Sequence, residues 1–383
     1  LDHHLAGAEL PGCVAVVNPS RQDEDGSLGH LCAAGVVFLL LVELNRRLRE
    51  AGRHGTDLIA MLDLVALATV ADVAPLTGLN RAFVRQGLKV MGRRLRPGLV
   101  ALADVARLDR PPTSYHLGYV LGPRVNAGGR IGAADLGARL LATTDPAEAA
   151  EMAGRLDALN TDRRDIEGRV RDAAMAQAEA RGLDAPLVWA AEAGWHPGVV
   201  GIVAARLKEA TNRPAVVIGF DGDAGKGSGR SVSGVDLGAA VQRLAAEGLI
   251  EKGGGHKMAA GLSLSRDQLD AAMARLTELM ARHGAGDRGP GELMLDGVLM
   301  PAACTVELID RLEEAGPYGA AAPAPRFALP GLRIGHARPV GQGHLKLTLS
   351  DGATRLEAIC FDAAGKGLDR ALQDHRGRAI HVA

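Results

Sequence analysis

The chain has 383 residues and a formal net charge of −1, from 44 lysines and arginines against 45 aspartates and glutamates. This balance excludes a protein that gathers nucleic acid through a global positive field, so a polyanion site must be local. Four scattered cysteines without a CxxC pair exclude a zinc knuckle and a disulfide framework. The longest apolar run, about 12 residues, is shorter than the ~20 residues that cross a bilayer. We therefore expect a cytoplasmic protein without a membrane segment.

The first residues already have the character of a chemical site. Asp2, His3 and His4 directly follow Leu1 and supply a carboxylate and two imidazoles. Carboxylates suit hard cations such as Mn²⁺ or Mg²⁺, and imidazole shifts the preference toward Mn²⁺. A capped turn or a surface histidine pair explains the triplet equally well, so both interpretations stay open. Because a domain rarely begins inside its active site, we expect an N-terminally truncated fragment of a longer protein.

Alternating apolar elements follow this triplet. A predicted strand at residues 12–17 precedes predicted buried helices at residues 33–48 and 58–70, a pattern typical of part of a parallel α/β sheet. Asp72 lies in an apolar stretch near Pro75, where it can either cap the helix end or bind a metal. Residues 81–130 hold ten lysines and arginines against two acids, which indicates either a solvated helix face or a wall that binds a polyanion.

Three further parts follow along the chain. Residues 146–180 read as a long polar connector helix with a thin apolar stripe. A second α/β unit begins after residue 186, with a glycine-rich turn expected between the strand PAVVIGF and residues 229–232, and an open glycine turn expected at 253–256. Short alternating strands at residues 344–349, 355–360 and 379–383 then predict a small, incomplete β-barrel.

Four glycine-rich segments carry polar groups suited to phosphate. Glycine permits close backbone approach, and an arginine fork can grip two phosphate oxygens. One segment alone is more often a turn, but together they favour a phosphodiester ligand. The candidate substrate-binding residues are Arg124, Asn126, Arg130, His196, Ser228, Arg230, Ser231, Gly254 and Gly255, with His256 beside them.

The order of these motifs resembles the DHH phosphoesterase superfamily, and within it the exonucleases specific for single-stranded DNA. The segments that carry the resemblance are Asp2-His3-His4, ALATVADVAPL, LGPRVNAGGRIGAA, GWHPGVVGIVAARL, GKGSGRSVSGVDL and KGGGHKMAAGL. The resemblance implies the C-terminal part of a DHH domain at residues 1–143 and a connector helix at 144–184. It also implies a DHH-associated α/β domain at 185–285 and an OB-fold at 286–383.

The same resemblance implies roles for individual residues. His3 would bind one of two Mn²⁺ or Mg²⁺ ions and Asp72 the other, with His4 close by and Asp2 orienting the histidines. His256 would contact the scissile phosphate. Ser228 and Arg230 would bind the 5′-terminal phosphate, and Arg130 or Arg124 the strand's backbone.

One departure from the family limits this expectation. The family takes most metal carboxylates from a DxD motif and a further aspartate that lie upstream of the DHH triplet, and this sequence has neither before Asp2. We therefore expect this chain to be inactive and poorly soluble. The longer protein would be a hydrolase, a 5′→3′ exonuclease acting in DNA repair and recombination.

Other functions remain open at this stage. One is a phosphodiesterase for oligoribonucleotides or cyclic dinucleotides, and another is a non-catalytic remnant that binds single strands. The expected partners are single-stranded DNA with a 5′ end, a helicase and a single-strand-binding protein, with the chain itself monomeric. Ten aromatic residues in the whole chain leave little base stacking, so binding should depend mainly on phosphate.

Overall fold

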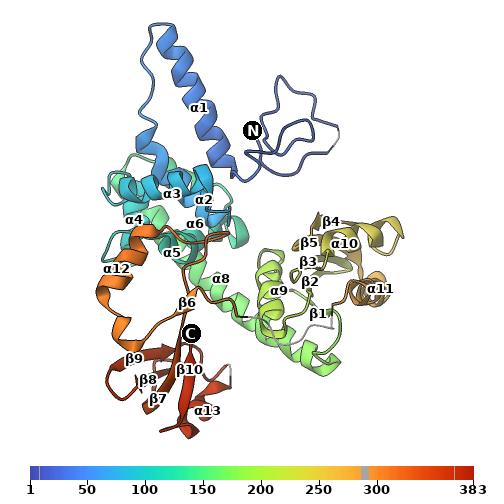
Figure 1. The fold of residues 1–383 in the computed structure, drawn as a ribbon. Helices are drawn as coiled ribbons and strands as arrows, with labels where there is room; N and C mark the ends of the chain where they lie inside the picture. The colour runs from blue at the N-terminus through green and yellow to red at the C-terminus, as the bar shows by residue number, and fades with distance from the viewer. Residues whose placement is uncertain (8, 286–292, 366) are drawn as a thin grey trace. The chain divides into compact units, whose positions relative to one another are not determined.

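The computed structural model describes residues 1–7, 9–285, 293–365 and 367–383, coloured along the chain in Figure 1. It divides into two compact units, which we describe separately. One unit comprises Leu1–Leu88 with Glu292–Ala383, and the other comprises Lys89–Gly291. Residues 286–292, the expected start of the barrel domain, lie outside the described residues.

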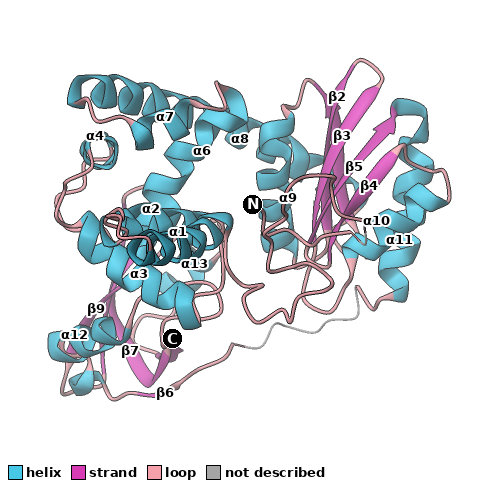
Figure 2. Ribbon diagram, turned by 90° about the horizontal axis from the view of Figure 1, so that it is seen from above, coloured by secondary structure: helices cyan, strands magenta, loops and turns pink. Residues whose placement is uncertain are grey.

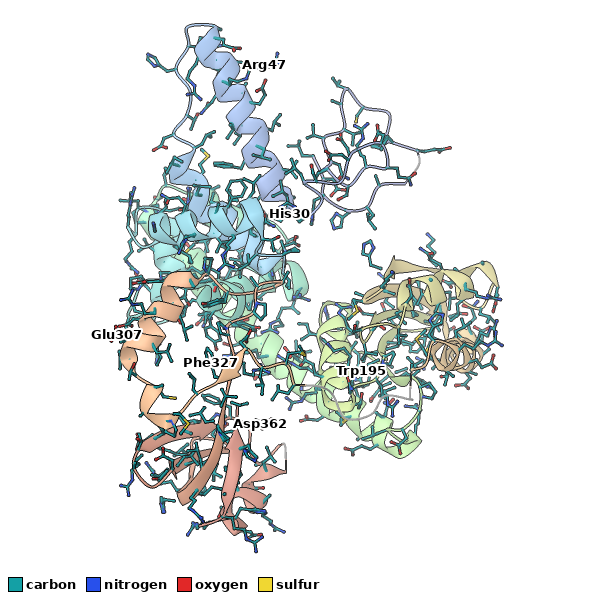
Figure 3. The ribbon with its side chains drawn as sticks, viewed as in Figure 1. His30, Arg47, Trp195, Glu307, Phe327 and Asp362 are labelled. Carbon is teal, nitrogen blue, oxygen red and sulfur yellow. The ribbon has the colours of Figure 1, made fainter. Side chains whose placement is uncertain are left out.

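Helices form the ordered N-terminal part of the first unit. They are α1 (Ala33–Glu50), a 3-10 turn η1 (Ile59–Met61), α2 (Leu62–Ala71) and α3 (Gly78–Met91), which confirms the helices predicted at residues 33–48 and 58–70. The expectation that the first helix is buried is wrong, because Leu40, Val42 and Leu44 are at least 40% exposed. Helix α1 extends beyond α2 and α3, with Arg47 near its far end (Figure 3). No described helix is both long enough and apolar enough to cross a membrane.

The strand predicted at residues 12–17 is not formed. This segment is largely exposed and irregular, and the described part of residues 1–143 contains helices but no strand. Two backbone bonds, from Asp2 N to Val17 O at 3.1 Å and from Ala6 N to Ser20 O at 3.4 Å, hold the segment instead. An apolar run becomes a strand only when a neighbouring strand pairs with it, and none does so here. The α/β class is carried by the parts of the chain that follow.

The C-terminal part of the first unit is a curled sheet with the strand order β10-β7-β8-β9, and β6 also pairs with β7. Leu332, Ile334, Leu345, Leu347 and Leu349 form its core. The three strands predicted here are confirmed, whereas β7 was not foreseen. The elements are β6 (Gly297–Val298), η4 (Pro301–Ala303), α12 (Val306–Ala315), β7 (Phe327–Val340), β8 (His344–Ser350), β9 (Arg355–Cys360), α13 (Leu368–Asp374) and β10 (Ala379–Val382).

Two arginines join α3 to the end of α12. The Arg81 and Arg85 guanidinium groups donate to the carbonyl oxygens of Ala315 and Glu314. The last carbonyls of a helix carry partial negative charge and lack partners within the helix, so cations bind there favourably. These two side chains therefore support the fold instead of forming part of a wall for a polyanion.

The second unit begins with short helices that pack on a long one. Helix α8 (Pro146–Arg181) confirms the long helix predicted at residues 146–180, and it lies wholly within this unit. The Asp145 carboxylate caps its start by accepting from Ala147 N at 2.7 Å. Packing is close, since a Cβ at Gly98 would lie 1.9 Å from Leu140 O. The other helical elements are α4 (Pro97–Val105), α5 (Ser114–His116), the π-helical turn η2 (Leu117–Leu121), α6 (Gly122–Ile131) and α7 (Leu136–Ala142).

A five-stranded sheet with the order β1-β2-β3-β5-β4 completes the second unit. Only β1 and β2 are parallel, and the other pairs are antiparallel. Helix α9 lies on one face of the sheet, and α10 and α11 lie on the other (Figure 2). The elements are β1 (Val188–Ala193), α9 (Pro197–Thr211), β2 (Ala215–Asp221), β3 (Ala224–Arg230), α10 (Leu237–Ala246), β4 (Lys252–His256), β5 (Ala259–Ser265), η3 (Arg266–Gln268) and α11 (Leu269–Arg282).

The glycine-rich segments expected to be turns are mostly strands. Residues up to Arg230 belong to β3, and Gly253 to His256 belong to β4. The glycines are needed for packing, because a Cβ at Gly225 would lie 2.6 Å from Phe220 and one at Gly229 would lie 2.7 Å from Leu237. Glycine within a strand often marks such close approaches.

Candidate functional site

The metal group, which we define as Asp2, His3, His4 and Asp72, begins in the irregular N-terminal segment. The Asn18 amide donates to His4 O at 2.8 Å, and its own oxygen accepts from Ser20 N at 2.8 Å. Asn18 is buried, so this amide anchors the triplet together with the backbone bond from Asp2 N to Val17 O. No strand supports the triplet in the described residues, and its position depends on polar contacts.

Asp2 orients the histidines that follow it. Its Oδ1 accepts from His3 N at 2.8 Å and lies 2.7 Å from His4 Nδ1. The hydrogen bond with His4, followed by that from the His3 backbone, lowers the pKa of Asp2 to about 2. The carboxylate is thus ionised. It contacts Nδ1 of His4, so Nε2 is the ring nitrogen of His4 that is left to bind a metal ion. Metal-binding histidines are usually oriented by a carboxylate in this way.

Asp72 faces the same group from the end of a helix. It follows the last residue of α2, and its Oδ2 lies 3.7 Å from His3 Nδ1. The next residue, Val73, has φ +57°, an unfavourable conformation for a β-branched side chain. A carboxylate at a helix C-terminus also meets the negative end of the helix dipole, so a cation beside Asp72 would be stabilising.

The donors of the metal group fit a divalent cation. Two atoms that each bind one ion at about 2.1 Å can be at most about 4.2 Å apart. The 3.7 Å between His3 and Asp72 satisfies this limit. The ligand atoms of Asp2, His3 and His4 lie within 4.8 Å of one another, close to the separation that one shared ion allows. Their oxygen and imidazole donors match the chemistry of Mn²⁺ or Mg²⁺.

The phosphate group, which we define as Arg130, Ser228 and Arg230, lies in the second unit. The Arg230 guanidinium donates to Ser228 Oγ at 3.0 Å and to Gly229 O at 2.9 Å, and that of Arg130 donates to Gly198 O at 2.9 Å. Burial lowers the pKa of Arg230, and the nearby charge of Arg130 lowers it further. Burial followed by the charge of Arg163 lowers the pKa of Arg130. Two half-buried cations beside each other favour an anion between or beside them.

Two glycines of α9 bring the phosphate group together. A Cβ at Gly198 would lie 2.3 Å from Arg130 O, and one at Gly201 would lie 2.9 Å from Ser228 Oγ. The start of α9 therefore packs directly between Arg130 and strand β3. His196 caps this helix, because its Nδ1 accepts from Gly198 N at 3.0 Å. The free backbone N–H groups of a helix N-terminus add a further attraction for anions.

Strand β4 adds His256 to the same face of the sheet. Arg230 pairs with Ala259, which pairs with His256, and directly paired residues of antiparallel strands share a face. Gly255 has φ +149°, and a Cβ there would lie 2.4 Å from Ala259 O. Glycine is thus required just before His256, where the chain turns from β4 into β5.

Two of the predicted site residues, Arg124 and Ser231, are engaged in contacts within the fold. Arg124 Nε donates to Asp157 Oδ1 at 2.8 Å and is largely enclosed against α8. Ser231 is buried, and its hydroxyl donates to Val235 O at 2.8 Å. Asn126 is exposed on α6. The structure uses Arg124 and Ser231 to hold neighbouring segments in place.

An exposed aromatic pair was not among the candidate residues. The rings of Tyr115 and Tyr119 lie 5.0 Å apart and are 62% and 74% exposed, just before α6. Large exposed rings are unusual unless they meet a partner, and bases stack on such rings. Their spacing of four residues is the sequence signal that places both on one side of a helical turn.

Family models match two parts of the chain. The DHHA1 domain matches residues 184–282, and the RecJ OB domain matches residues 295–382.

Curated relatives match almost the whole chain. The single-stranded-DNA-specific exonuclease RecJ of Escherichia coli (strain K12) is 38% identical over 400 residues, which cover 100% of this chain and 68% of the relative. The RecJ of Dickeya dadantii is 39% identical over 94% of this chain and 66% of its own length. The chain thus spans about two thirds of the curated relatives it matches.

Solved structures agree with the sequence matches. The RecJ of Thermus thermophilus in complex with Mn²⁺ is 34% identical with a TM-score of 0.78, covering 93% of this chain and 51% of that one. A structure of exonuclease RecJ bound to manganese is 35% identical with a TM-score of 0.61, covering 76% of this chain and 70% of that one.

Proposed function

Because the chain belongs to the RecJ family, we propose that it is the substrate-binding and partial metal-binding portion of a 5′→3′ exonuclease that hydrolyses single-stranded DNA. The names of its relatives and their Mn²⁺- and Mg²⁺-bound structures support this proposal. The proposed division into parts at residues 1–143, 144–184, 185–285 and 286–383 is supported by α8 and by the two family matches.

The observation that carries the proposal is the phosphate group. Arg130 and Arg230 keep two guanidinium groups half-buried beside each other, an arrangement that depresses the pKa of Arg230. Water would solvate these cations better than the protein does, and Glu167 compensates the charge of Arg130 only in part, so an anionic ligand would be bound favourably here. Ser228, which already accepts from Arg230, adds a hydroxyl to the same face. A terminal 5′-phosphate offers the oxygens and charge that these donors match.

His3 would bind one divalent cation and Asp72 the other, with Asp2 positioning His4 close by. When bound there, Mn²⁺ or Mg²⁺ would supply the positive charge that lowers the pKa of a water nucleophile and stabilises charge on the leaving oxygen. His256 would contact the scissile phosphate as a hydrogen-bond donor. Arg130 with the exposed Asn126 would hold the strand's backbone, whereas Arg124 is engaged by Asp157. Gly254 and Gly255 would let the strand approach β4 closely, and His196 would orient the start of α9.

The metal-binding residues of this chain limit the reaction that it can carry out by itself. Among the described residues, the metal group has two carboxylates, and Asp2 already accepts from its neighbours. Two divalent cations need more negative charge than this. We therefore expect the chain to bind DNA ends without cutting them. A monomeric state, a cytoplasmic location, and a helicase or single-strand-binding protein as partners belong to the same proposal for the longer protein.

Replacing Arg230 with alanine tests the proposed end recognition. The change removes a charge-assisted contact to phosphate, so affinity for a 5′-phosphorylated oligothymidylate should fall roughly tenfold. Affinity for the same strand with a 5′-hydroxyl should fall much less. Fluorescence anisotropy in EDTA measures both without cleavage.

The matched control is Arg206→Ala, which removes an arginine from the exposed side of α9. It should leave both affinities nearly unchanged. Equal losses on the two kinds of end for Arg230→Ala would contradict a role in recognising the 5′-phosphate.

A further inference from the structure

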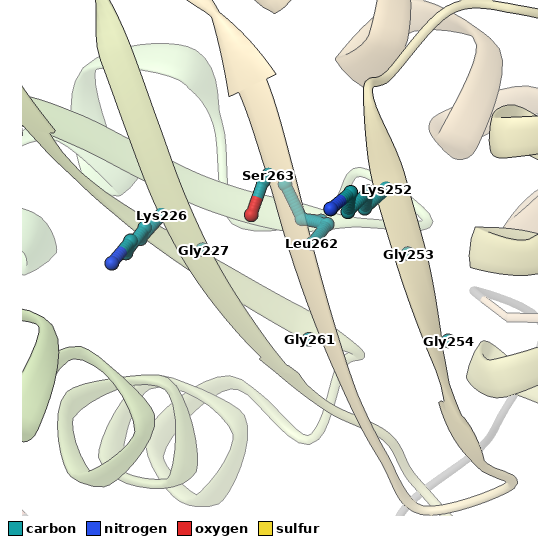
Figure 4. A pocket seen from close by; sticks show the side chains of 8 residues that line it. All are labelled: Lys226, Gly227, Lys252, Gly253, Gly254, Gly261, Leu262 and Ser263. Carbon is teal, nitrogen blue, oxygen red and sulfur yellow. The ribbon is translucent and has the colours of Figure 1, made fainter.

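An open groove with a volume of about 470 Å³ crosses strands β3, β5 and β4 (Figure 4). Gly254 and Gly261 form part of its floor, and Lys226, Ser263 and Lys252 line one end. The figure shows these three side chains on three adjacent strands. None of the functions described above uses the two lysines.

The strand register divides the groove into successive rows, each made of residues that are paired across β3, β5 and β4. Lys226, Ser263 and Lys252 are directly paired across the three strands. The next row on the same face holds Ser228 with Gly261 and Gly254. The row after that holds Arg230 and His256. Successive rows on one face are two residues apart, or about 7 Å along the strands.

The lysine row carries uncompensated positive charge. In the described part of the chain neither Lys226 nor Lys252 forms an ion pair with a carboxylate. On β2 the neighbour of Lys226 is Gly219, which is covered by the backbone of Trp195, since a Cβ at Gly219 would lie 2.0 Å from Trp195 O. Glu192 of β1 follows Gly219 in the same row and hydrogen-bonds with Gln177, but it forms no ion pair with Lys226. Both lysines are exposed, whereas Leu262 and Leu264 point to the opposite face and are buried under α10 and α11. Lys226 and Lys252 lie two strand spacings apart, about 10 Å, so their long side chains can converge on one anion over Ser263.

The order of the rows indicates what that anion is. From His256 and Arg230, the groove leads past Ser228 to the lysines, away from the end where the scissile phosphate would lie. We propose that Lys226, Ser263 and Lys252 form a subsite for the additional phosphates of a DNA or RNA 5′ end that bears a di- or triphosphate. This inference rests on the proposed function, in which Ser228 and Arg230 hold the first 5′-phosphate. The floor of glycines leaves space for the phosphate chain, and the ammonium groups match its charge.

Anisotropy titrations of the full chain test the subsite. The probes are one oligonucleotide with a 5′-hydroxyl, a 5′-monophosphate or a 5′-triphosphate, in EDTA at fixed salt. The wild-type chain should bind the triphosphate about fivefold or more tighter than the monophosphate, the size expected for partly exposed ion pairs. The double variant Lys226→Gln/Lys252→Gln should abolish this ratio and keep the preference for monophosphate over hydroxyl.

Lys208→Gln, which removes a lysine of α9 that does not line the groove, should leave every ratio unchanged. Equal binding of triphosphate and monophosphate by the wild type would overturn the subsite. So would a double variant that loses affinity equally for all three ends, because the lysines would then bind the backbone. A wild type that does not distinguish monophosphate from hydroxyl would instead overturn the proposed end recognition. Thermal melts confirm that the variants fold.

Discussion

Asp2, His3 and His4 are held by a few hydrogen bonds in an irregular segment, whereas Arg130, Ser228 and Arg230 are held by two helices packed against a sheet. In the first region, the Asn18 amide and the Asp2 carboxylate carry most of the organisation. In the second region, Gly198 and Gly201 let α9 approach so closely that no side-chain atom fits between the elements. A phosphate-binding surface that is already rigid needs little reorganisation to bind its ligand. The metal group would gain its rigidity from the ion itself.

The largest expected effect comes from adding one methyl group to the packed region. Gly198→Ala would place Cβ 2.3 Å from Arg130 O. Because the obstacle is backbone, α6 or α9 must move, and we expect the free energy of unfolding to fall by about 1–3 kcal/mol. Urea titration measures this loss, and the affinity for a 5′-phosphorylated strand should fall with it.

Gly129→Ala is the matched control in the same region. Gly129 lies within α6, and a Cβ there would meet open space. Alanine favours the helix, so stability should rise by about 0.5–1 kcal/mol. If Gly198→Ala were as harmless as this control, close packing would not be what holds the phosphate group.

A smaller effect is expected in the metal group. Asp72→Asn removes a ligand charge, so we expect the affinity for Mn²⁺ to fall roughly tenfold or more. Mn²⁺ should raise the melting temperature of the wild type by mass action, and this shift should shrink in the variant. Calorimetric titration with Mn²⁺ measures the affinity, and Glu50→Gln on the exposed end of α1 is the control. Equal Mn²⁺ affinity in wild type and Asp72→Asn would remove Asp72 from the metal group.

The smallest effect concerns exposed charges that belong to neither group. Arg275 and then Arg243 lower the pKa of Glu247 from 4.5 to about 2. The stability that this carboxylate adds is therefore fully present above pH 4.5 and is lost as the pH falls toward 2. Glu247→Gln should lower the melting temperature at pH 7 by about 1–3 °C, and by less at pH 3. If Glu247→Gln lowered the melting temperature equally at pH 7 and pH 3, the ion pairs of Glu247 would contribute nothing to stability.

Local sequence predicts the helices well and the glycine-rich strands poorly. Residues 146–180 carry their own helical signal, and α8 matches them. Strand β3 contains Gly225, Gly227 and Gly229, which read as a turn until the large side chains beside them are known. Those neighbours, such as Leu262 and Leu237, come from other strands and helices. Residues 12–17 present the opposite case, since an apolar run without a pairing partner stays irregular.

In the candidate site too, some features follow from residue type, whereas others follow only from tertiary contacts. Arginines, serine and glycines indicated phosphate chemistry from their types alone. That Arg130 lies beside Arg230, a hundred positions away, follows from the packing of α6 and α9. That Ser231 is buried and Arg124 is paired with Asp157 also depends on tertiary contacts. Residue type thus predicted the ligand class, whereas only the fold distinguishes binding residues from supporting ones.

Helix α8 constrains how this unit can change in length during evolution. Its 36 residues span about 54 Å. Its first half packs under Gly128 through Leu156, and its second half packs on β1 and α9 through Ala174 and Ala178. One inserted residue between these halves would turn one against the other by about 100°. An insertion of seven would restore their phase to within about 20°. Homologous proteins should therefore differ in the length of this helix by about seven residues, or two helical turns, at a time.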